Sequence, residues 1–122
     1  MNKRKKIIYI SGPYSEFKSN EGITYKIEDN IKIARKIAIR LWEKGFTVIC
    51  PHLNTIHFEK DCKLSYDDYI DGDLEILSRC DAIYMTPFYD YSSGAKKEKE
   101  HAKKIGIEIF DNESQIEKWV IR

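Results

Sequence analysis

The sequence has no long hydrophobic run, which argues against a helix that spans a membrane. Such a helix needs about 20 consecutive, mainly apolar residues. The apolar stretch that follows the basic N-terminal residues is only Ile7–Ile10, which is also too short for the hydrophobic region of a signal peptide. We therefore expect a cytoplasmic protein that makes no contact with a membrane.

Cysteine is scarce as well, and its spacing excludes two further classes of protein. The chain has three cysteines, Cys50, Cys62 and Cys80, an odd number without a Cys-x-x-Cys pair. This pattern favours reduced thiols over a disulfide framework. Neither His52 nor His57 stands at a standard zinc-ligand spacing from these cysteines, so we expect no metal site.

Neither sign of charge is in excess. The 122 residues include 21 Lys and Arg and 20 Asp and Glu, a net charge of +1. A wide basic surface, which binding to polymeric nucleic acid requires, is therefore not expected. The sequence also lacks a Walker loop and a Gly-x-Gly-x-x-Gly fingerprint, and no Ser- and Thr-rich cradle for a flavin phosphate follows the first apolar run. We expect no bound cofactor.

Short apolar runs alternate with helical patterns along the whole chain. Four runs rich in β-branched or aromatic residues predict buried strands, at Ile7–Ile10, Phe46–Cys50, Ala82–Met85 and Ile107–Phe110. Helical patterns occupy about Ile27–Lys44, Asp67–Arg79, Ser92 or Ser93 to Gly106, and Glu113–Trp119. This alternation predicts one α/β domain over residues 1–122. We expect a doubly wound, flavodoxin-like parallel sheet of four or five strands in the order 2-1-3-4, with helices on both faces.

The segments that follow the first and third strands are the predicted ligand site. In a doubly wound sheet, ligands bind beyond the carboxyl ends of the strands where the winding reverses. The residues placed there are Ser11, Gly12 and Tyr14 from the first strand, and Ser92, Ser93 and Gly94 from the third. The two serines suit a sugar hydroxyl or an anion at a helix start, but equally a plain helix cap. Tyr14 could stack on a base or merely cover the end of the sheet.

A glutamate lies on the apolar side of the third predicted helix. Ala95, Glu98, Ala102 and Ile105 recur at spacings of three and four, whereas lysines dominate the opposite side. Glu98 therefore belongs to the stripe that should face inward, about one turn from the helix start.

The second predicted helix repeats this anomaly. Asp73 falls on the inward stripe of Ile70, Leu74 and Leu77. Carboxylates are rarely buried without a partner or a function. Two of them on neighbouring helices suit a nucleophile and a general acid, as in glycosidic chemistry. The alternative is that each caps a backbone group or pairs with a lysine, and the helical pattern alone leaves both interpretations open.

Three short stretches, in their order and spacing, resemble a known family. They are Ile8–Pro13, then Asp73–Leu77 followed by Cys80-Asp81-Ala82, and finally Ser92–Ala95 with Glu98. Asn30 and Pro51–Asn54 extend the similarity over most of the chain. The resemblance is to the nucleoside 2-deoxyribosyltransferase-like superfamily, in particular its small bacterial and phage members, and implies that residues 1–122 form one such domain.

The resemblance implies an enzyme that cleaves or exchanges the N-glycosidic bond of a (deoxy)nucleoside or nucleoside 5′-monophosphate. Members attack the anomeric carbon with a glutamate and form a glycosyl-enzyme. By this similarity Glu98 is the nucleophile, Asp73 is the acid that assists the departing base, and Tyr9 orients Glu98. Ser92, Ser93 and Gly94 would hold the 5′ end of the ligand.

The sequence departs from the family pattern at the phosphate site. The related hydrolases hold phosphate with a basic, glycine-rich loop after the first strand, whereas Ser11–Ser15 contains no arginine. Lys18 is the candidate substitute. The phosphorylation state of the substrate and the choice of base or water as acceptor therefore stay open.

A non-catalytic nucleotide-binding or sensing module on the same fold is the alternative to an enzyme. The two inward carboxylates favour the enzyme, because a binder gains little from burying them. Relatives form dimers or larger rings. In addition, the apolar and aromatic surface of residues such as Tyr66, Tyr69 and Phe88 is larger than a small sheet can cover. We expect a homodimer or a higher homo-oligomer that takes a small-molecule nucleoside or nucleotide.

Overall fold

Four parallel strands form the central sheet of the computed structural model, which describes residues 6–121. They are β1 (Ile7–Ser11), β4 (Thr47–Ile49), β5 (Ala82–Met85) and β6 (Glu108–Phe110), in the order β4-β1-β5-β6. All three neighbouring pairs are parallel, and Ser11 at the end of β1 lies opposite Met85 at the end of β5. This confirms the predicted α/β fold, because the four predicted strands lie in the predicted order 2-1-3-4.

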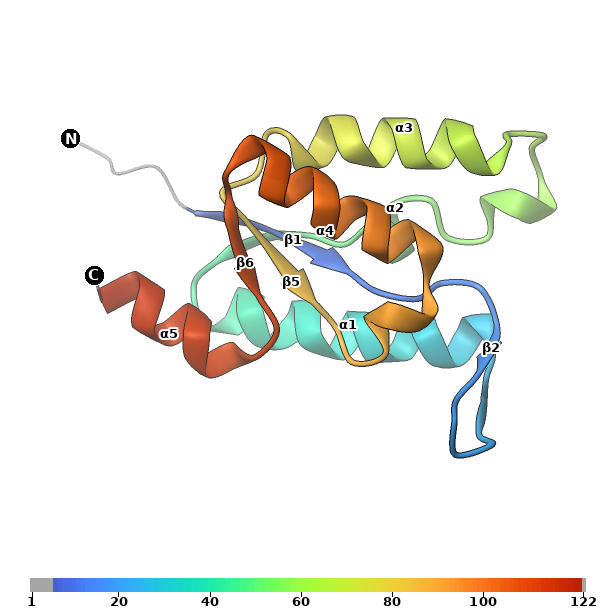
Figure 1. Cartoon of the computed structure of the whole chain (residues 1–122), viewed down its shortest axis with the longest axis horizontal. Coiled ribbons are helices and arrows are strands. Elements are labelled where there is room, and N and C mark those ends of the chain that lie inside the picture. The colour runs from blue at the N-terminus through green and yellow to red at the C-terminus, as the bar shows by residue number, and fades with distance from the viewer. Residues whose placement is uncertain (1–5, 122) are drawn as a thin grey trace.

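Helices cover both faces of the sheet (Figure 1). α1 (Ile27–Glu43) and α5 (Glu113–Ile121) pack on one face, and α3 (Tyr66–Leu77) and α4 (Ser93–Ile105) pack on the other. Alternate residues of a strand point to opposite faces. Ile8 and Ile10 of β1 therefore join the core under α1 and α5, whereas Tyr9 joins the core under α3 and α4.

Local sequence fixes the starts of the two helices nearest the candidate site. Ser65 precedes α3, and its Oγ accepts the Asp68 N–H at 3.1 Å while its own N–H donates to the Asp68 carboxylate at 2.8 Å. This reciprocal pair is a capping box. Ser92 precedes α4, and its Oγ accepts the Ala95 N–H at 3.0 Å. Both helices start at the end of the sheet where β1 and β5 finish (Figure 1).

Two segments outside the predicted strands and helices contain short regular elements. A hairpin of β2 (Phe17–Lys18) and β3 (Thr24–Tyr25) follows β1, and α2 (Pro51–Asn54) and the 3₁₀ turn η1 (Phe58–Lys60) follow β4. Elements of two to four residues are too short to show a periodic pattern. They were therefore not visible in the sequence.

The inward stripe predicted for α4 is correct except at its last position. Ala95, Glu98 and Ala102 are buried, but Ile105 is 39% exposed. Ile105 is the last residue of α4, where the chain turns at Gly106 with a positive φ of 79° and leaves the helix. The periodic pattern could not show that the packing against the sheet ends one turn earlier.

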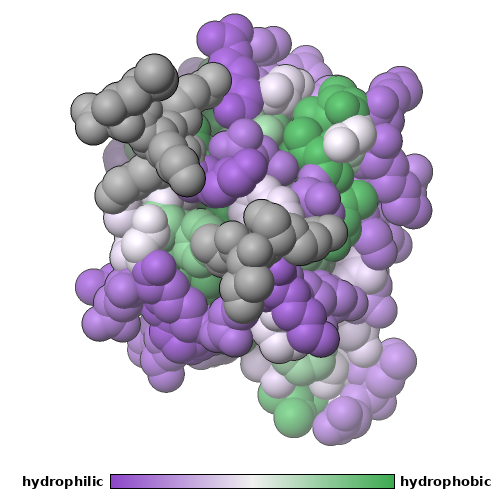
Figure 2. All heavy atoms as spheres, turned by 90° about the vertical axis from the view of Figure 1, so that its left-hand side faces the viewer, coloured by the Kyte–Doolittle hydropathy of each residue, from purple (hydrophilic) through white to green (hydrophobic). Residues whose placement is uncertain are grey.

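The end of the molecule opposite the candidate site is mainly hydrophilic. Figure 2 shows this face, where hydrophobic groups form separate small areas among polar side chains.

In the part of the chain that the structure describes, no helix is both long and apolar enough to cross a membrane.

Candidate active site

A cavity of about 370 Å³ lies at the carboxyl end of the sheet, between α2, α3 and the start of α4. Its size is typical of a site for a small organic ligand. Seven of the nine site residues expected from the sequence line it: Gly12, Tyr14, Asp73, Ser92, Ser93, Gly94 and Glu98. The other two, Tyr9 and Ser11, are buried behind Glu98 and bond to it.

The Glu98 carboxylate lies at the bottom of the cavity and receives two short hydrogen bonds. Tyr9 Oη donates to Oε2 at 2.5 Å, and Ser11 Oγ donates to Oε1 at 2.6 Å. The residue is only 6% exposed. A carboxylate oxygen has two acceptor positions, so each oxygen keeps one that these two donors do not use. The side chain is therefore oriented but not saturated.

The pleat of β1 explains this arrangement. Tyr9 and Ser11 are two residues apart and so point to the same face of the sheet, the face on which α4 packs. Glu98 stands in the second turn of α4 and meets both hydroxyls. The sequence predicted the Tyr9 contact through a family resemblance but placed Ser11 among the ligand-binding residues. The two-residue spacing from Tyr9 was the signal that Ser11 also faces Glu98.

The environment of Glu98 raises its pKa to about 7. Burial is the largest cause, and the negative charge of Asp73 adds to it, whereas the hydrogen bonds from Ser11 and Tyr9 act in the opposite direction. The same burial and the nearby carboxylates raise the pKa of Tyr9 well above its usual value, so Tyr9 remains a hydrogen-bond donor. Near neutral pH both the ionised and the protonated form of Glu98 are populated.

Asp73 enters the cavity from α3 and is only partly buried. Burial raises its pKa to about 6. Among the described residues none donates a hydrogen bond to this carboxyl group. Asp73 can therefore bond to a ligand and hold or release a proton in the same pH range as Glu98.

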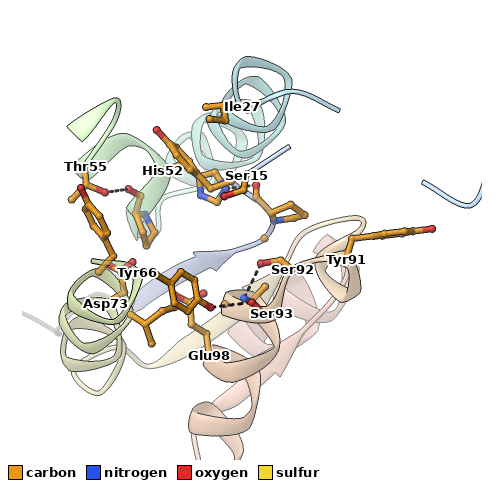
Figure 3. A pocket seen from close by; sticks show the side chains of 18 of the residues that line it. Ser15, Ile27, His52, Thr55, Tyr66, Asp73, Tyr91, Ser92, Ser93 and Glu98 are labelled. Carbon is orange, nitrogen blue, oxygen red and sulfur yellow. Dashed lines mark hydrogen bonds between the residues drawn. The ribbon is translucent and has the colours of Figure 1, made fainter. Parts of the chain in front are cut away.

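The start of α4 closes another side of the cavity and is covered by α3. Figure 3 shows Tyr66 reaching Ser93, and their hydroxyl oxygens are 3.1 Å apart. A Cβ atom added at Gly94 would lie 3.1 Å from Ile70 Cδ1 and 3.2 Å from Tyr66 Oη. This close approach explains why a glycine stands between the two helices. Ser92, by contrast, uses its Oγ as the helix cap.

The charged residues that line the cavity are mainly acidic. Glu16, Glu59, Asp73 and Glu98 line it, and no lysine or arginine is found among its described lining residues. Lys18, which the sequence suggested as a phosphate ligand, lies on β2, is exposed and does not line the cavity. The hairpin of β2 and β3 on which Lys18 lies was not predicted from the sequence.

The segment between β4 and α3 contributes a wall of the cavity. Its lining residues were not among the site residues predicted from the sequence. His52, Thr55 and Glu59 line the cavity from it, and Tyr69 and Ile70 line the cavity from α3. His52 Nε2 lies 2.6 Å from the Pro13 carbonyl oxygen, and burial lowers the pKa of His52. Within residues 6–121, no group of three or more His, Cys, Asp or Glu side chains is arranged to bind a metal ion.

Known proteins were compared with the chain by sequence and by structure. No curated protein matches its sequence. Several solved structures match its fold, among them a 2-deoxyribosyltransferase from the psychrotolerant bacterium Bacillus psychrosaccharolyticus, with a TM-score of 0.55 and 18% sequence identity. That match covers 84% of this chain and 69% of the transferase. At this identity the comparison shows a shared fold. One family model also matches residues 6–111, so the chain belongs to the family described as Domain of unknown function (DUF4406).

Proposed function

We propose that the protein cleaves or exchanges the N-glycosidic bond of a (deoxy)nucleoside or nucleoside 5′-monophosphate. The observation that carries this proposal is the buried Glu98 carboxylate at the bottom of the cavity, held by the Tyr9 and Ser11 hydroxyls. A second carboxyl group, Asp73, faces the same cavity with a raised pKa. One carboxylate fixed as a nucleophile and another able to hold a proton are what glycosyl transfer needs. The shared fold with a 2-deoxyribosyltransferase supports the same assignment.

In the first step Glu98 attacks the anomeric carbon of the sugar. A bond forms between a Glu98 oxygen and this carbon, and the bond from the carbon to the base nitrogen breaks. The electron pair of the broken bond goes to the base, which takes a proton from Asp73. The base leaves, and the sugar remains bound to Glu98 as an ester.

In the second step an acceptor releases the sugar from Glu98. A nitrogen of a second base, or a water oxygen, attacks the same carbon and gives its proton to Asp73. The Glu98 carboxylate is regenerated, and two inversions leave the configuration at the carbon retained. Transfer and hydrolysis differ only in this acceptor.

The two ends of the substrate bind on opposite sides of Glu98 in this proposal. The start of α4, with Ser92, Ser93 and Gly94, takes the 5′ end of the sugar, next to Ser11 at the end of β1 and to Gly12, which follows it. The base lies toward Asp73, because that residue supplies its proton. His52 and Thr55 lie on the Asp73 side of the cavity in Figure 3, where they would face the base.

A panel of nucleosides and 5′-monophosphates tests the proposal. Each donor is incubated with the protein alone and with a second free base, and free base and exchanged nucleoside are separated by chromatography. Release or exchange with wild-type protein, lost in Glu98→Gln, is the expected result. Binding of donors without turnover under every pairing would instead indicate a nucleotide-binding or sensing module.

Trapping of the intermediate identifies the nucleophile. A 2′-fluoro nucleoside that reacts slowly should leave its sugar on the protein, and peptide mass spectrometry should find the label on Glu98. Label on another residue would contradict the assignment.

The surface around the cavity supports self-association. Five exposed hydrophobic side chains between residues 53 and 66 form what we name the 53–66 patch: Leu53, Ile56, Phe58, Leu64 and Tyr66. The same segment includes the cavity residues Thr55 and Glu59. Exposed apolar groups concentrated in one segment are typical of a protein interface. We infer a homodimer or a higher homo-oligomer.

A further inference from the structure

The Tyr14 side chain is held at its hydroxyl group by the segment that follows α2. Tyr14 Oη donates to the Glu59 carboxylate, 3.0 and 3.1 Å from its two oxygens, and accepts the backbone N–H of His57 at 3.1 Å. A phenol has one hydrogen to donate in a hydrogen bond, and here the Glu59 carboxylate accepts that bond. What Tyr14 offers to a ligand in the cavity is therefore its ring.

Further contacts fix the backbone and the ring of Tyr14. The Asn30 side chain is 3% exposed, and its Nδ2 donates to the carbonyl oxygens of Tyr14 and Ser15, both at 3.0 Å. The His52 ring meets the Tyr14 ring edge to face, with ring centroids 5.7 Å apart. Three segments distant in sequence thus converge on this one tyrosine of the cavity wall.

The turn that reaches Tyr14 has an unfavourable local structure. His57 adopts a left-handed backbone conformation with a φ of 60°, which is uncommon for a residue other than glycine. Its Nδ1 atom is buried without a hydrogen-bond partner among the described residues, while its Nε2 lies 2.9 Å from Glu28 Oε1. Such strained residues persist where the surrounding structure holds them, and they cluster at functional sites. Here the strained residue directs its N–H to the Tyr14 hydroxyl.

We propose that Glu59 and His57 are positioning residues that hold the Tyr14 ring against the base of the bound substrate. The inference rests on the proposed function, because it requires an N-glycosidic substrate in this cavity. The Tyr14 ring packs on His52, which lies on the Asp73 side of the cavity, away from Ser92 and Ser93 (Figure 3). The base, which Asp73 protonates, therefore meets this ring.

The proposal separates binding from bond cleavage. No hydrogen bond joins Glu59 or His57 to Glu98 or Asp73 among the described residues, so their loss should leave the chemical step unchanged. Their loss should instead release the Tyr14 ring and weaken the binding of the base, which appears as a higher KM and a higher Kd.

A double-mutant cycle tests whether Glu59 acts through Tyr14. Tyr14→Phe and Glu59→Ala are each expected to raise KM about fivefold, the effect of losing one ordinary, solvent-exposed hydrogen bond, with kcat changed by less than about twofold. The double variant should be no worse than either single variant. Kd for the best donor nucleoside, measured by calorimetry in the Glu98→Gln background, should follow the same pattern.

Two matched variants separate positioning from a structural role. Glu59→Gln keeps an oxygen that accepts from Tyr14 Oη and should recover most of the affinity that Glu59→Ala loses. Asp61→Asn changes an exposed acid two residues away and should leave KM as in the wild type.

The outcomes of this cycle are distinct from those of the proposed function. Additive increases in KM, or a fall in kcat at unchanged KM, in an active enzyme would overturn the positioning role while the proposed function stands. If the wild type released no base from any donor, the proposed function would fail and this inference with it.

Discussion

Glu98 combines two requirements that oppose each other. Its position on the apolar stripe of α4 desolvates the carboxyl group and raises its pKa to about 7, from an ordinary value of 4.5. A nucleophile must be ionised, and the hydroxyls of Tyr9 and Ser11 are the groups that stabilise the charge. The folded state binds the Glu98 proton more tightly than the unfolded chain. The contribution of Glu98 to stability is therefore largest at low pH and is lost as the pH rises from about 4.5 through about 7.

Glu98→Gln should abolish turnover and stabilise the fold above neutral pH. The rise in the pKa of Glu98 from 4.5 to about 7 corresponds to about 3 kcal/mol between its two protonation states. The amide of the glutamine variant removes the buried charge. We expect the free energy of unfolding at pH 8, measured by urea denaturation, to rise by about 1–3 kcal/mol. At pH 4 and below the difference should nearly vanish, because Glu98 of the wild type is then mainly protonated in both the folded and the unfolded state. A variant less stable than the wild type at pH 8 would contradict this account of the site.

The pH dependence of kcat/KM should be bell-shaped. Glu98 must be ionised, so activity should fall below its pKa of about 7, and Asp73 must be protonated, so activity should fall above its pKa of about 6. The nucleophile has the higher pKa, so the active combination is a minor form and the optimum lies between these two values. Because the two carboxyl groups interact, the measured values belong to the pair.

Asp73→Asn tests the assignment of the alkaline limb. The variant cannot donate a proton to the base, so it should lose this limb and slow poor leaving groups about 100-fold or more, the usual contribution of a general acid. A donor whose base leaves without protonation should be affected far less. An unchanged alkaline limb in the variant would assign this limb to another group.

At the scale of elements, β1 shows what the sequence could and could not reveal. The apolar run Ile7–Ile10 predicted the strand, and the inward stripes of the helices predicted that Glu98 and Asp73 face the core side. The strand period places Ser11 on the same face of the sheet as Tyr9, but whether its hydroxyl reaches Glu98 also depends on how α4 packs against β1, which no local pattern shows. The positions of His52, Thr55 and Glu59 depend on short turns whose geometry is set by tertiary contacts.

Gly12 at the end of β1 should not tolerate a side chain. A Cβ atom at this position would overlap Oγ1 of Thr86, which follows β5 and is 2% exposed. Gly12→Ala should lower the free energy of unfolding by about 1–3 kcal/mol, as expected for overpacking, and reduce activity by displacing Ser11. Urea denaturation and the base-release assay measure the two effects.

Two further variants make the Gly12 test specific. Adding Thr86→Ala removes the overlapping oxygen and should recover part of the stability. Gly72→Ala makes the same change within α3, where the new Cβ meets no atom within 4 Å, and should stabilise the helix by about 0.5–1 kcal/mol. Equal losses in Gly12→Ala with and without Thr86→Ala would contradict the proposed overlap.

At the scale of the whole molecule, the fold was predictable because its pattern is repeated. Four apolar runs and the helices between them leave few arrangements once crossovers must be right-handed, and the order β4-β1-β5-β6 follows. The hairpin of β2 and β3 was not predictable. It is held from outside by rings of other segments, since Phe17 stacks on Tyr91 with centroids 4.9 Å apart and the Asn20 N–H donates to the Tyr91 hydroxyl at 2.8 Å.

The quaternary state is a property of the whole molecule that the 53–66 patch makes testable. The 53–66 patch leaves Leu64 51% exposed and Tyr66 48% exposed. Covering such groups in an interface gains about 25 cal/mol per Å² of apolar surface. Sedimentation at micromolar concentration should therefore give a dimer or a larger assembly. Leu64→Lys should shift it toward the monomer, whereas Ile39→Lys on α1, also partly exposed, should not. A monomeric wild type would contradict the inferred assembly. Dissociation by Ile39→Lys alone would move the interface to α1, away from the candidate site.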